Sequence, residues 1–434
     1  MQLTIHRGTQ EIGGTCIEIA SGNSRILLDV GLPLFDAQQQ LLDTRPFRSQ
    51  STNELLKSGI IPKVEGLTGG ERLPDAILLS HAHLDHCGLL DRTSPQIPVY
   101  ATSGTSKMMK AGSIFAGQVE LPRERFRKLT PEQPTQIGNF RVTAYSVDHS
   151  IFGAVAILVE ADGQSLLYSG DLRLHGRKTG MAKKLIKAFQ NKKLDVLLME
   201  GTHLGHTSSQ QTTEYDLEDE ISDYVRNAPS LVLASFSPQH VDRLVAFIRA
   251  AKKTGRTFIA DVYTAYVLHS IASETKVPVP GIDENLPVFV PAILWANESK
   301  QRMIKKKFPQ FLRARIEIDE ILTNPAKYVM IFRPSMMESD FGGRLPTGVV
   351  CLHSRWEGYL DQPDAMEMKQ AIEVAQGQLI QAHVSGHIRS EDSLELIRQL
   401  NPGRVIPVHT FSPEKLAERL TNVRLMKDRE ILQL

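Results

Sequence analysis

Short apolar runs alternate with turn residues through the first half of the chain. Runs of this length, rich in β-branched residues and bounded by polar or glycine-containing turns, are typical of β-strands. The pair Asp162-Gly163 lies between two such runs and favours a two-residue hairpin. We expect strands at residues 2–7, 14–20, 24–30, 76–80, 140–147, 155–160 and 165–169, and a helix at 105–115.

From residue 214 the pattern changes to alternating helices and strands. Val241, Leu244, Val245 and Ile248 form a helical apolar stripe that ends at Gly255. Helices that alternate with buried strands indicate a second unit with a parallel sheet. We expect further helices at 214–226, 265–273, 364–376 and 390–400, and strands at 231–236, 257–262, 349–353, 379–384 and 405–408. Residues 283–346 fit neither pattern.

Composition and charge narrow the class of protein. The 434 residues are 41% hydrophobic and 23% charged, which is ordinary for a soluble globular protein of two or three domains. The net charge of +1 excludes the large basic excess of proteins that coat nucleic acid non-specifically. Any polyanion must therefore be bound in a local cleft.

The sequence predicts a cytoplasmic protein that does not enter a membrane. The beginning, MQLTIHRGTQEIGG, lacks the regions of a secretory signal, and no apolar run is long enough to span a bilayer. The three cysteines form no C-x-x-C pair, as expected in a reducing compartment.

The segment LLSHAHLDHCGLL contains four potential metal ligands directly after an apolar run. His81 and His83 are two residues apart, so in an extended segment they project to the same side and can hold one ion. Asp85 and His86 lie beyond the expected bend and could hold a second ion. Imidazoles mixed with a carboxylate suit zinc first and manganese second. The motif therefore predicts a site for two metals.

Two further strands end in side chains of the same kind. Asp148 and His149 follow one apolar run, and Asp171 follows another. Taken alone, His149 would be a structural histidine and Asp171 a turn residue more often than ligands. Because they repeat the arrangement at His81, they are candidates for the same site.

These segments resemble, in order, the successive motifs of the metallo-β-lactamase fold. The matching stretches are L-D-V-G at Asp29, S-H-A-H-L-D-H, D-H-S-I-F-G-A and S-G-D-L-R. Later stretches, E-G-T from Glu200, S-G-H ending at His387 and P-V-H ending at His409, resemble motifs A, B and C of the β-CASP group. That group comprises nucleic-acid-processing members of the fold, including ribonuclease J and the cleavage and polyadenylation nucleases. The resemblance covers essentially the whole chain.

The resemblance implies an α/β architecture, a metallo-β-lactamase αββα sandwich with an inserted β-CASP α/β domain. On that basis we expect the metallo-β-lactamase domain at residues 1–205 and 355–434, the closing part carrying motifs B and C. The β-CASP insertion would comprise residues 206–354.

The resemblance also implies two divalent metal ions, zinc by preference and manganese as second choice. A hydroxide between the ions would attack the phosphorus. The implied ligands are His81, His83 and His149 for the first metal, Asp85, His86 and His409 for the second, and Asp171 as a bridge between both.

The leaving oxygen then needs a proton. His387 is the expected general acid, because imidazole titrates near working pH. Glu200 would orient His387 or raise its pKa. Together with Asp85 these are the expected catalytic residues. Asp29 is expected to orient the site without binding metal.

Two further assignments concern Asp148 and the stretch that ends at His387. Asp148 is expected either to hold a ligand imidazole or to cap the end of its strand. His383, Ser385 and Gly386 resemble the H-V-S-G-H stretch with which ribonuclease J members bind a nucleotide phosphate.

The implied function is a metal-dependent phosphodiesterase that cleaves single-stranded RNA as an endonuclease, a 5′-to-3′ exonuclease or both. Two alternatives stay open: a DNA nuclease of the same family, and a metallo-hydrolase of small esters or thioesters. The DNA branch usually has valine in place of His409, and the small-ester enzymes normally lack the insertion. A non-catalytic relative would have lost ligands, whereas every ligand position is filled. The oligomeric state, including a homodimer, also stays open.

Overall fold

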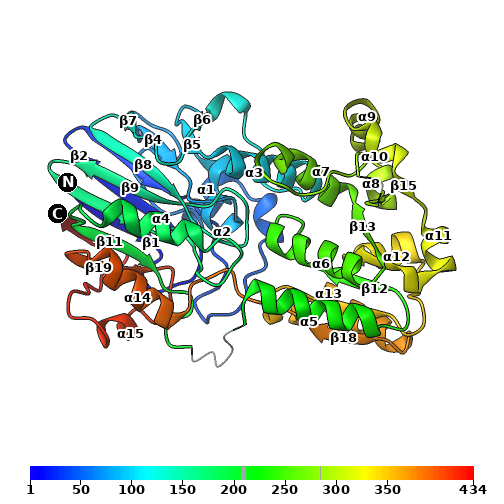
Figure 1. The fold of residues 1–434 in the computed structure, drawn as a ribbon. Coiled ribbons are helices and arrows are strands. Elements are labelled where there is room, and N and C mark those ends of the chain that lie inside the picture. The colour runs from blue at the N-terminus through cyan, green and yellow to red at the C-terminus, as the bar shows by residue number, and fades with distance from the viewer. Residues whose placement is uncertain (207–211, 284) are drawn as a thin grey trace. The chain divides into compact units, whose positions relative to one another are not determined.

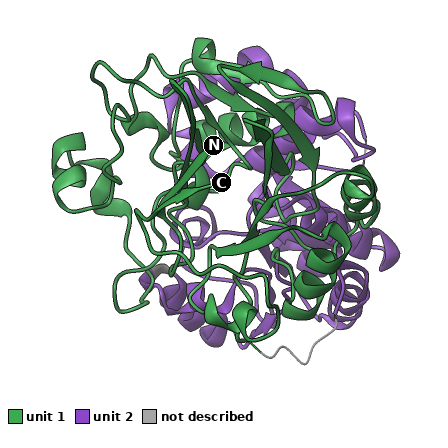
Figure 2. Cartoon of the chain, turned by 90° about the vertical axis from the view of Figure 1, so that its left-hand side faces the viewer, with its two compact units in different colours: residues 1–210, 386–434 green, residues 211–385 purple. Residues whose placement is uncertain are grey.

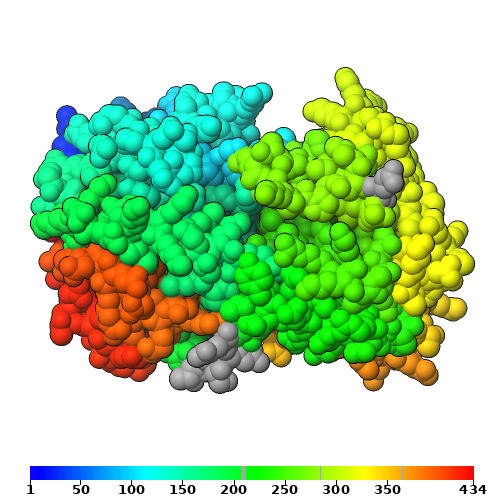
Figure 3. Space-filling model, in the orientation of Figure 1, coloured from blue at the N-terminus to red at the C-terminus, as the bar shows by residue number. Residues whose placement is uncertain are grey.

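The computed structural model describes residues 1–206, 212–283 and 285–434 (Figures 1 and 3), and the chain divides into two compact units (Figure 2). Unit 1 comprises residues 1–210 and 386–434, and unit 2 comprises residues 211–385. The second junction lies later in the chain than the boundary after residue 354 expected from the sequence. The physical reason is that β18 (Gln378–Gln381) pairs in parallel with β17 (Val350–His353) and so extends the sheet of unit 2.

Unit 1 contains two β-sheets. The first combines antiparallel pairing at β1, β2 and β3 with parallel pairing from β3 to β6. In spatial order its strands are β20 (Ile431–Gln433), β1 (Gln2–Arg7), β2 (Cys16–Ser21), β3 (Ser24–Leu28), β4 (Ala76–Leu78), β5 (Val99–Ala101) and β6 (Phe126–Lys128). The second sheet consists of β19 (Arg404–Val408), β11 (Val196–Glu200), β10 (Gln164–Tyr168), β9 (Val155–Ala161), β8 (Phe140–Ser146) and β7 (Thr135–Ile137).

The two sheets of unit 1 share one apolar core. Ile5 and Leu28 contribute to it from the first sheet, and Val142 and Leu198 from the second. Successive side chains of a strand point to opposite faces, which is why alternate residues of these strands enter this core. The sandwich therefore holds the carboxyl ends of β4, β8, β10, β11 and β19 in fixed positions.

The helices of unit 1 are α1 (Thr52–Lys57), α2 (Leu84–Cys87), α3 (Ser103–Phe115), α4 (Gly180–Phe189), α14 (Ser390–Leu400) and α15 (Glu414–Ala417). Leu185 and Phe189 of α4, with Leu394 and Ile397 of α14, pack against the second sheet in a core separate from the one between the sheets. Helix α14 ends at Asn401, whose left-handed conformation (φ 46°) stops the helix.

Unit 2 is built on a parallel sheet, as the alternation of helices and strands predicts. Its strands in spatial order are β15 (Arg315–Ile316), β14 (Val288–Phe289), β13 (Thr257–Asp261), β16 (Tyr328–Ile331), β12 (Val232–Ser235), β17 and β18. The middle strands are continuously buried because helices cover both faces of the sheet. Helices α5 and α6 contribute to the core on one face, and α12 and α13 to the core on the other.

The helices of unit 2 are α5 (Glu214–Asn227), α6 (Val241–Lys253), α7 (Val262–Ile271), α8 (Ala292–Trp295), α9 (Glu298–Lys307), α10 (Pro309–Arg313), α11 (Ile318–Thr323), α12 (Met336–Phe341) and α13 (Pro363–Val374). Residues 283–346, for which the sequence predicts no element, contain several of these short helices and strands. Among the residues that the structure describes, no helix is both long and apolar enough to cross a membrane.

The predicted hairpin is confirmed. Ala161 pairs with Gln164, and Asp162 and Gly163 between them both have positive φ, 53° and 72°. Two positive φ values are what the tightest hairpin turns need. The three cysteines are free and buried, as a protein without disulfides requires.

Candidate metal centre

The histidine-rich segment lies at the end of β4, as its sequence predicts. Ser80 and His81 follow the strand, and His83 is the N-cap residue of α2 with an extended backbone (φ −71°, ψ 149°). Asp85 and His86 belong to the first turn of α2. One short strand–helix junction therefore supplies four side chains that the rest of unit 1 surrounds.

All seven predicted metal ligands lie together in unit 1. They form groups in which the potential ligand atoms are within 4.8 Å of one another, and Asp171 belongs to every group. The groups among the described residues are His81, His83, His149 and Asp171; Asp85, His86, Asp171 and His409; and Asp171, Glu200, His387 and His409.

In the first group, three imidazoles converge on one point. His83 Nδ1 lies 3.1 Å from His81 Nε2 and 3.1 Å from His149 Nε2. Burial, followed by the charge of neighbouring imidazoles, holds the pKa of His81 and His149 well below the usual range, and burial lowers that of His83 to about 4. Neutral imidazoles with converging lone pairs are the form of histidine that binds a metal ion.

In the second group, carboxylates alternate with imidazoles. Asp85 Oδ2 lies 3.1 Å from His409 Nε2 and 3.5 Å from His86 Nε2. Burial alone would lower the pKa of His86, but the carboxylates of Asp171, Asp85 and Asp29 hold it well above the usual range. This group thus attracts positive charge more strongly than the first.

The shared residue Asp171 is buried without the partners that a carboxylate needs. Its side chain is 1% exposed, and among the described residues neither of its oxygens has a hydrogen-bond partner; the same holds for Nε2 of His86. His86 Nε2 and Asp171 Oδ2 approach to 3.1 Å, but without hydrogen-bond geometry. Burial disfavours the charged carboxylate, but the imidazoles of His409, His86 and His387 hold the pKa of Asp171 well below the usual range. A cation between these atoms would satisfy the oxygens that lack hydrogen-bond partners, so the donor set fits metal ions.

Asp29, which the sequence predicts to orient the site without binding metal, contacts His86. Its Oδ2 lies 2.8 Å from His86 Nδ1, which turns Nε2 of the same ring toward the ligand group. Asp29 also accepts hydrogen bonds from the Ser80 backbone and hydroxyl and from Tyr168 Oη. Its φ of 58° is a strained backbone value for a non-glycine residue, and His409 has a similar one of 54°.

His149 is oriented from the other end of the chain. Its Nδ1 donates to the backbone oxygen of Gly386 at 2.6 Å, so that Nε2 faces the first group. Asp148 accepts hydrogen bonds from Arg173 Nε and the Lys178 backbone, and so ties two neighbouring turns together.

Glu200, at the end of β11, contacts His387. The distance from Glu200 Oε1 to His387 Nδ1 is 3.2 Å, and the Thr202 hydroxyl lies 3.1 Å from the same nitrogen. Burial alone would lower the pKa of His387, but Glu200 and then Asp171 raise it to about 9. The side chain of His387 is 23% exposed, which leaves its ring within reach of a substrate.

The residues predicted to bind phosphate fall on both sides of the second unit junction. His383 and Ser385 belong to unit 2, and Gly386 to unit 1. In unit 2, Arg243 Nη1 lies 3.5 Å from His383 Nδ1, and Arg243 donates to the backbone oxygens of Ala382 and Val384. Arg243 therefore fixes the chain on both sides of His383.

Sequence reasoning missed three of these orienting residues. Thr202 contacts both His387 and His409, at 3.1 and 3.0 Å, yet in the sequence only its place inside the E-G-T stretch marks it. Tyr168 precedes the S-G-D stretch and looks like a strand residue. Arg243 looks like one charge on an amphipathic helix, and only the structure shows it completely buried.

Two stacked sheets with histidines and aspartates at the strand ends define the class of metallo-β-lactamase-fold proteins. Comparison with known proteins agrees: residues 62–222 match the family described as beta-lactamase superfamily domain. A crystal structure of a protein of unknown function from Enterococcus faecalis V583 superimposes with a TM-score of 0.79 at 22% identity, covering 100% of this chain and 99% of that one. The predicted fold class is confirmed, and the fold implies divalent metal ions.

Several characterised relatives are similar over most of the chain. An RNase J-like protein of Methanocaldococcus jannaschii is 24% identical over 77% of this chain and 72% of its own. Ribonuclease J of Pyrococcus abyssi is 24% identical over 93% of this chain and 88% of its own. Transcription termination factor FttA of Methanothermobacter thermautotrophicus is 24% identical over 61% of this chain and 42% of its own. The chain thus has a ribonuclease J-like metallo-β-lactamase fold.

Proposed function

We propose that the protein is a metal-dependent hydrolase that cleaves phosphodiester bonds of single-stranded RNA. The observation that carries this proposal is the set of ligand groups that share Asp171, a buried carboxylate without hydrogen-bond partners among the described residues. The similarity to ribonuclease J supports RNA as the substrate and does not favour a small ester or thioester. DNA remains the alternative that the assay below tests.

The side chains that would hold the metals divide into two sets. His81, His83 and His149 would hold one ion, Asp85, His86 and His409 the other, and Asp171 would contact both. We propose zinc, because imidazole nitrogens outnumber carboxylate oxygens in this donor set. Bound divalent ions supply Lewis acidity toward the phosphate and lower the pKa of water.

The chain's own residues provide orientation and proton transfer. Asp29 and the Gly386 carbonyl hold the rings of His86 and His149, so that little reorganisation is needed when substrate binds. Glu200 and Thr202 occupy the Nδ1 side of His387. We propose that His387 delivers a proton from Nε2 to the leaving oxygen, and that Glu200 keeps the ring in that orientation.

The first test is a product-length assay. The substrate is single-stranded RNA with a 5′-monophosphate and a 3′ label, with a DNA strand of the same sequence in parallel and zinc or manganese supplied. Cleavage of RNA alone supports the proposal. A ladder of shortening labelled fragments assigns a 5′ exonuclease, and a few internal cuts assign an endonuclease. If neither strand is cut, the RNA-cleaving function is rejected.

The second test removes the first ligand group. The double variant His81→Ala with His83→Ala should lose RNA cleavage and bound metal together, as measured by product formation and by elemental mass spectrometry. His269→Ala is the matched control, because His269 is an exposed histidine of α7 outside the ligand groups. Cleavage by the double variant at the rate of the control would contradict the assigned site.

A further inference from the structure

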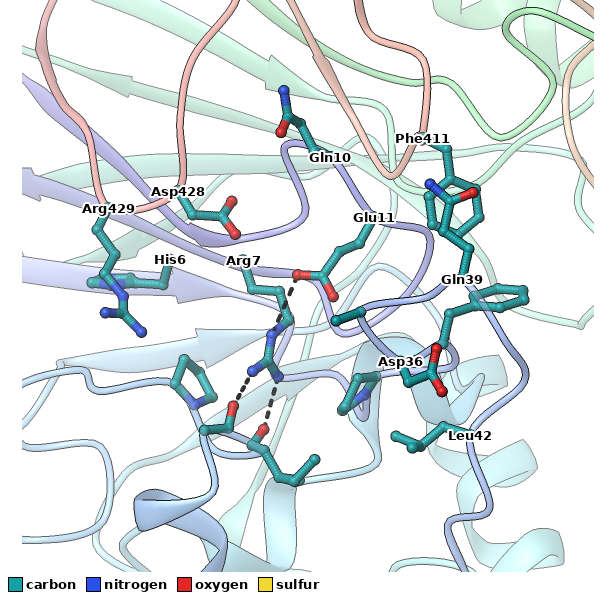
Figure 4. Close-up of a pocket in the computed structure, with 16 residues that line it drawn as sticks. His6, Arg7, Gln10, Glu11, Asp36, Gln39, Leu42, Phe411, Asp428 and Arg429 are labelled. Atoms are coloured by element: carbon teal, nitrogen blue, oxygen red, sulfur yellow. Dashed lines mark hydrogen bonds and ion pairs between the residues drawn. The ribbon is translucent and has the colours of Figure 1, made fainter.

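A pocket of about 680 Å³ opens in unit 1 (Figure 4). Its walls come from the end of β1 and the loop after it, from the segment that follows β3, and from two loops near the C-terminus. The residues that matter here are Gln10, Glu11, Phe35, Asp36, Gln39, Phe411 and Asp428. The proposed cleavage reaction does not use any of them.

The loop between β1 and β2 connects this pocket with the second ligand group. Gln10 and Glu11 of the loop line the pocket. At one end of the loop, the backbone oxygen of Gly8 accepts a hydrogen bond from His409 N at 2.7 Å. At the other end, a Cβ on Gly13 would lie 3.0 Å from Asp85 Cβ, so the loop packs directly on that residue. The pocket is therefore separated from two proposed metal ligands by one loop.

An aromatic pair forms one wall of the pocket. The rings of Phe35 and Phe411 meet edge to face, with centroids 5.2 Å apart and an interplanar angle of 75°. Both side chains are only partly buried. Phe411 lies two residues after His409, so this wall is rigidly linked to the ligand group. A flat ring could stack on such a wall.

Carboxyl groups outnumber guanidinium groups among the side chains that line the pocket, which disfavours a phosphate. Glu11, Asp36 and Asp428 bring three carboxyl groups against the guanidinium groups of Arg7 and Arg429, and the amides of Gln10 and Gln39 add further acceptors. Arg7 is already engaged: its guanidinium donates to the backbone oxygens of Gly59 and Ile60 and pairs with Glu11 at 3.4 Å, as Figure 4 shows.

A nucleobase matches this combination of an aromatic wall and hydrogen-bonding groups. Unpaired bases in RNA are recognised by stacking on aromatic side chains and by hydrogen bonds to their edges. Carboxylates and amides can accept hydrogen bonds from the N–H groups of a base edge. Burial raises the pKa of Glu11 to about 7, so this carboxyl can also take part as a donor near neutral pH.

We propose that this pocket binds one unstacked base of the RNA strand, at a fixed position next to the cleaved bond. The base would stack on Phe411 and present its edge to the acceptors of the loop between β1 and β2. The proposal rests on the proposed RNA cleavage. It adds that the enzyme recognises a base at one position of the substrate relative to the cleaved bond. It predicts that the enzyme senses the presence of a base at one particular nucleotide.

The test uses RNA substrates in which one nucleotide at a time lacks its base. With the wild-type protein, base removal at one position near the cleavage site should raise KM about five- to hundredfold, the range that stacking of one base on an aromatic side chain gives. In Phe411→Ala this position-specific effect should disappear, because the wall that senses the base is gone. Phe126→Ala, which changes a half-buried phenylalanine of β6 outside this pocket, should keep it.

A second variant controls for the possibility that Phe411→Ala acts by displacing His409, which lies two residues earlier in the chain. Phe35→Ala alters the same wall from a segment remote in sequence from the ligands, and should also remove the position-specific effect. Binding of the same RNAs in EDTA, measured by fluorescence anisotropy, should show the same profile without cleavage. If both variants keep the wild-type profile, the pocket proposal is overturned. If the wild-type protein cleaves no RNA at all, the proposed function fails instead.

Discussion

The two units bury charged side chains in opposite ways. In unit 1, Asp171 is surrounded by imidazoles and carboxylates, and its oxygens have no hydrogen-bond partner among the described residues. In unit 2, two buried carboxylates meet guanidinium groups: Glu214 lies 3.1 Å from Arg243, and Asp261 pairs with Arg333. Unit 2 thus pairs these carboxylates with arginines, whereas unit 1 gathers imidazoles and carboxylates around points that metal ions could occupy.

This difference separates a ligand site from a structural pair without reference to any relative. A buried ion pair with internal partners is weak evidence for function, because it serves the fold equally well. A buried carboxylate whose oxygens accept no hydrogen bond leaves acceptor sites that a bound cation can fill, so its presence points to a ligand. The charges of unit 1 are therefore the ones that indicate chemistry.

The largest expected effect comes from making the same substitution in both units. Asp171→Asn should reduce RNA cleavage by more than about 10⁴-fold, a fraction of the acceleration that enzymes supply. In EDTA it should lower the free energy of unfolding less than Asp261→Asn does, because neither Asp171 oxygen has a hydrogen-bond partner to lose among the described residues. Cleavage is measured in single turnovers, bound metal by mass spectrometry and stability by urea unfolding.

Asp261→Asn is the matched control for that substitution. It removes the partner of Arg333 and weakens the cap of α7, where Asp261 accepts from Thr264 N at 3.0 Å. We expect it to lose stability and to keep its bound metal. If Asp171→Asn loses as much stability in EDTA as Asp261→Asn does, the contrast between the two units is not real.

The second prediction breaks the ion pair of unit 2. Arg243→Met should destabilise unit 2 by about 3–5 kcal/mol, because it leaves the completely buried Glu214 without its guanidinium. Both tryptophans, Trp295 and Trp356, lie in unit 2, so tryptophan fluorescence during urea unfolding reports on this unit alone.

The double variant Arg243→Met with Glu214→Gln sharpens the result. It should recover part of the lost stability, since no unpaired charge remains buried. A loss below about 1 kcal/mol for Arg243→Met alone is what an exposed pair gives, and would show that the pair is not the structural element assumed here.

How well the sequence predicts the structure depends on how far apart in the chain the contacting residues lie. The strand at 2–7 and the helix at 390–400 are found with the predicted limits, because local periodicity and capping determine them. Residues 283–346 could not be assigned, since most of their helices and strands are too short to develop a period, and the longer α9 buries Ile304 but has no apolar stripe.

The candidate site follows the same rule. One local stretch predicts the candidate ligands His81, His83, Asp85 and His86. The contact between His149 and Gly386, and those of Thr202 with His387 and His409, join segments far apart in the chain. No local pattern encodes such contacts, so the orienting partners needed the structure.

The smallest expected effect concerns Glu18, a carboxylate of unit 1 whose two oxygens, unlike those of Asp171, both have hydrogen-bond partners. Glu18 Oε1 accepts from Arg25 Nε at 2.7 Å, and Glu18 Oε2 lies 2.7 Å from His6 Nε2. Burial alone would raise the pKa of Glu18, but the hydrogen bonds to His6 and Arg25 outweigh it and lower the pKa to about 2. Because the folded state has the lower pKa, the stabilisation is complete above the unfolded value near 4.5 and is lost as the pH falls toward 2.

The pH dependence is measured as a difference between proteins, because many carboxyl groups titrate in this range. The unfolding free energy of the wild type minus that of Glu18→Gln should fall by at most about 3 kcal/mol between pH 5 and pH 2. Glu160→Gln is the control: Glu160 pairs with Arg141 at 2.7 Å, but the Arg141 side chain is 54% exposed and that of Glu160 31%, so solvent screens the pair and its difference should change much less. If the unfolding free energy of the wild type minus that of Glu18→Gln is also independent of pH, the pairing of Glu18 with Arg25 and His6 does not stabilise unit 1.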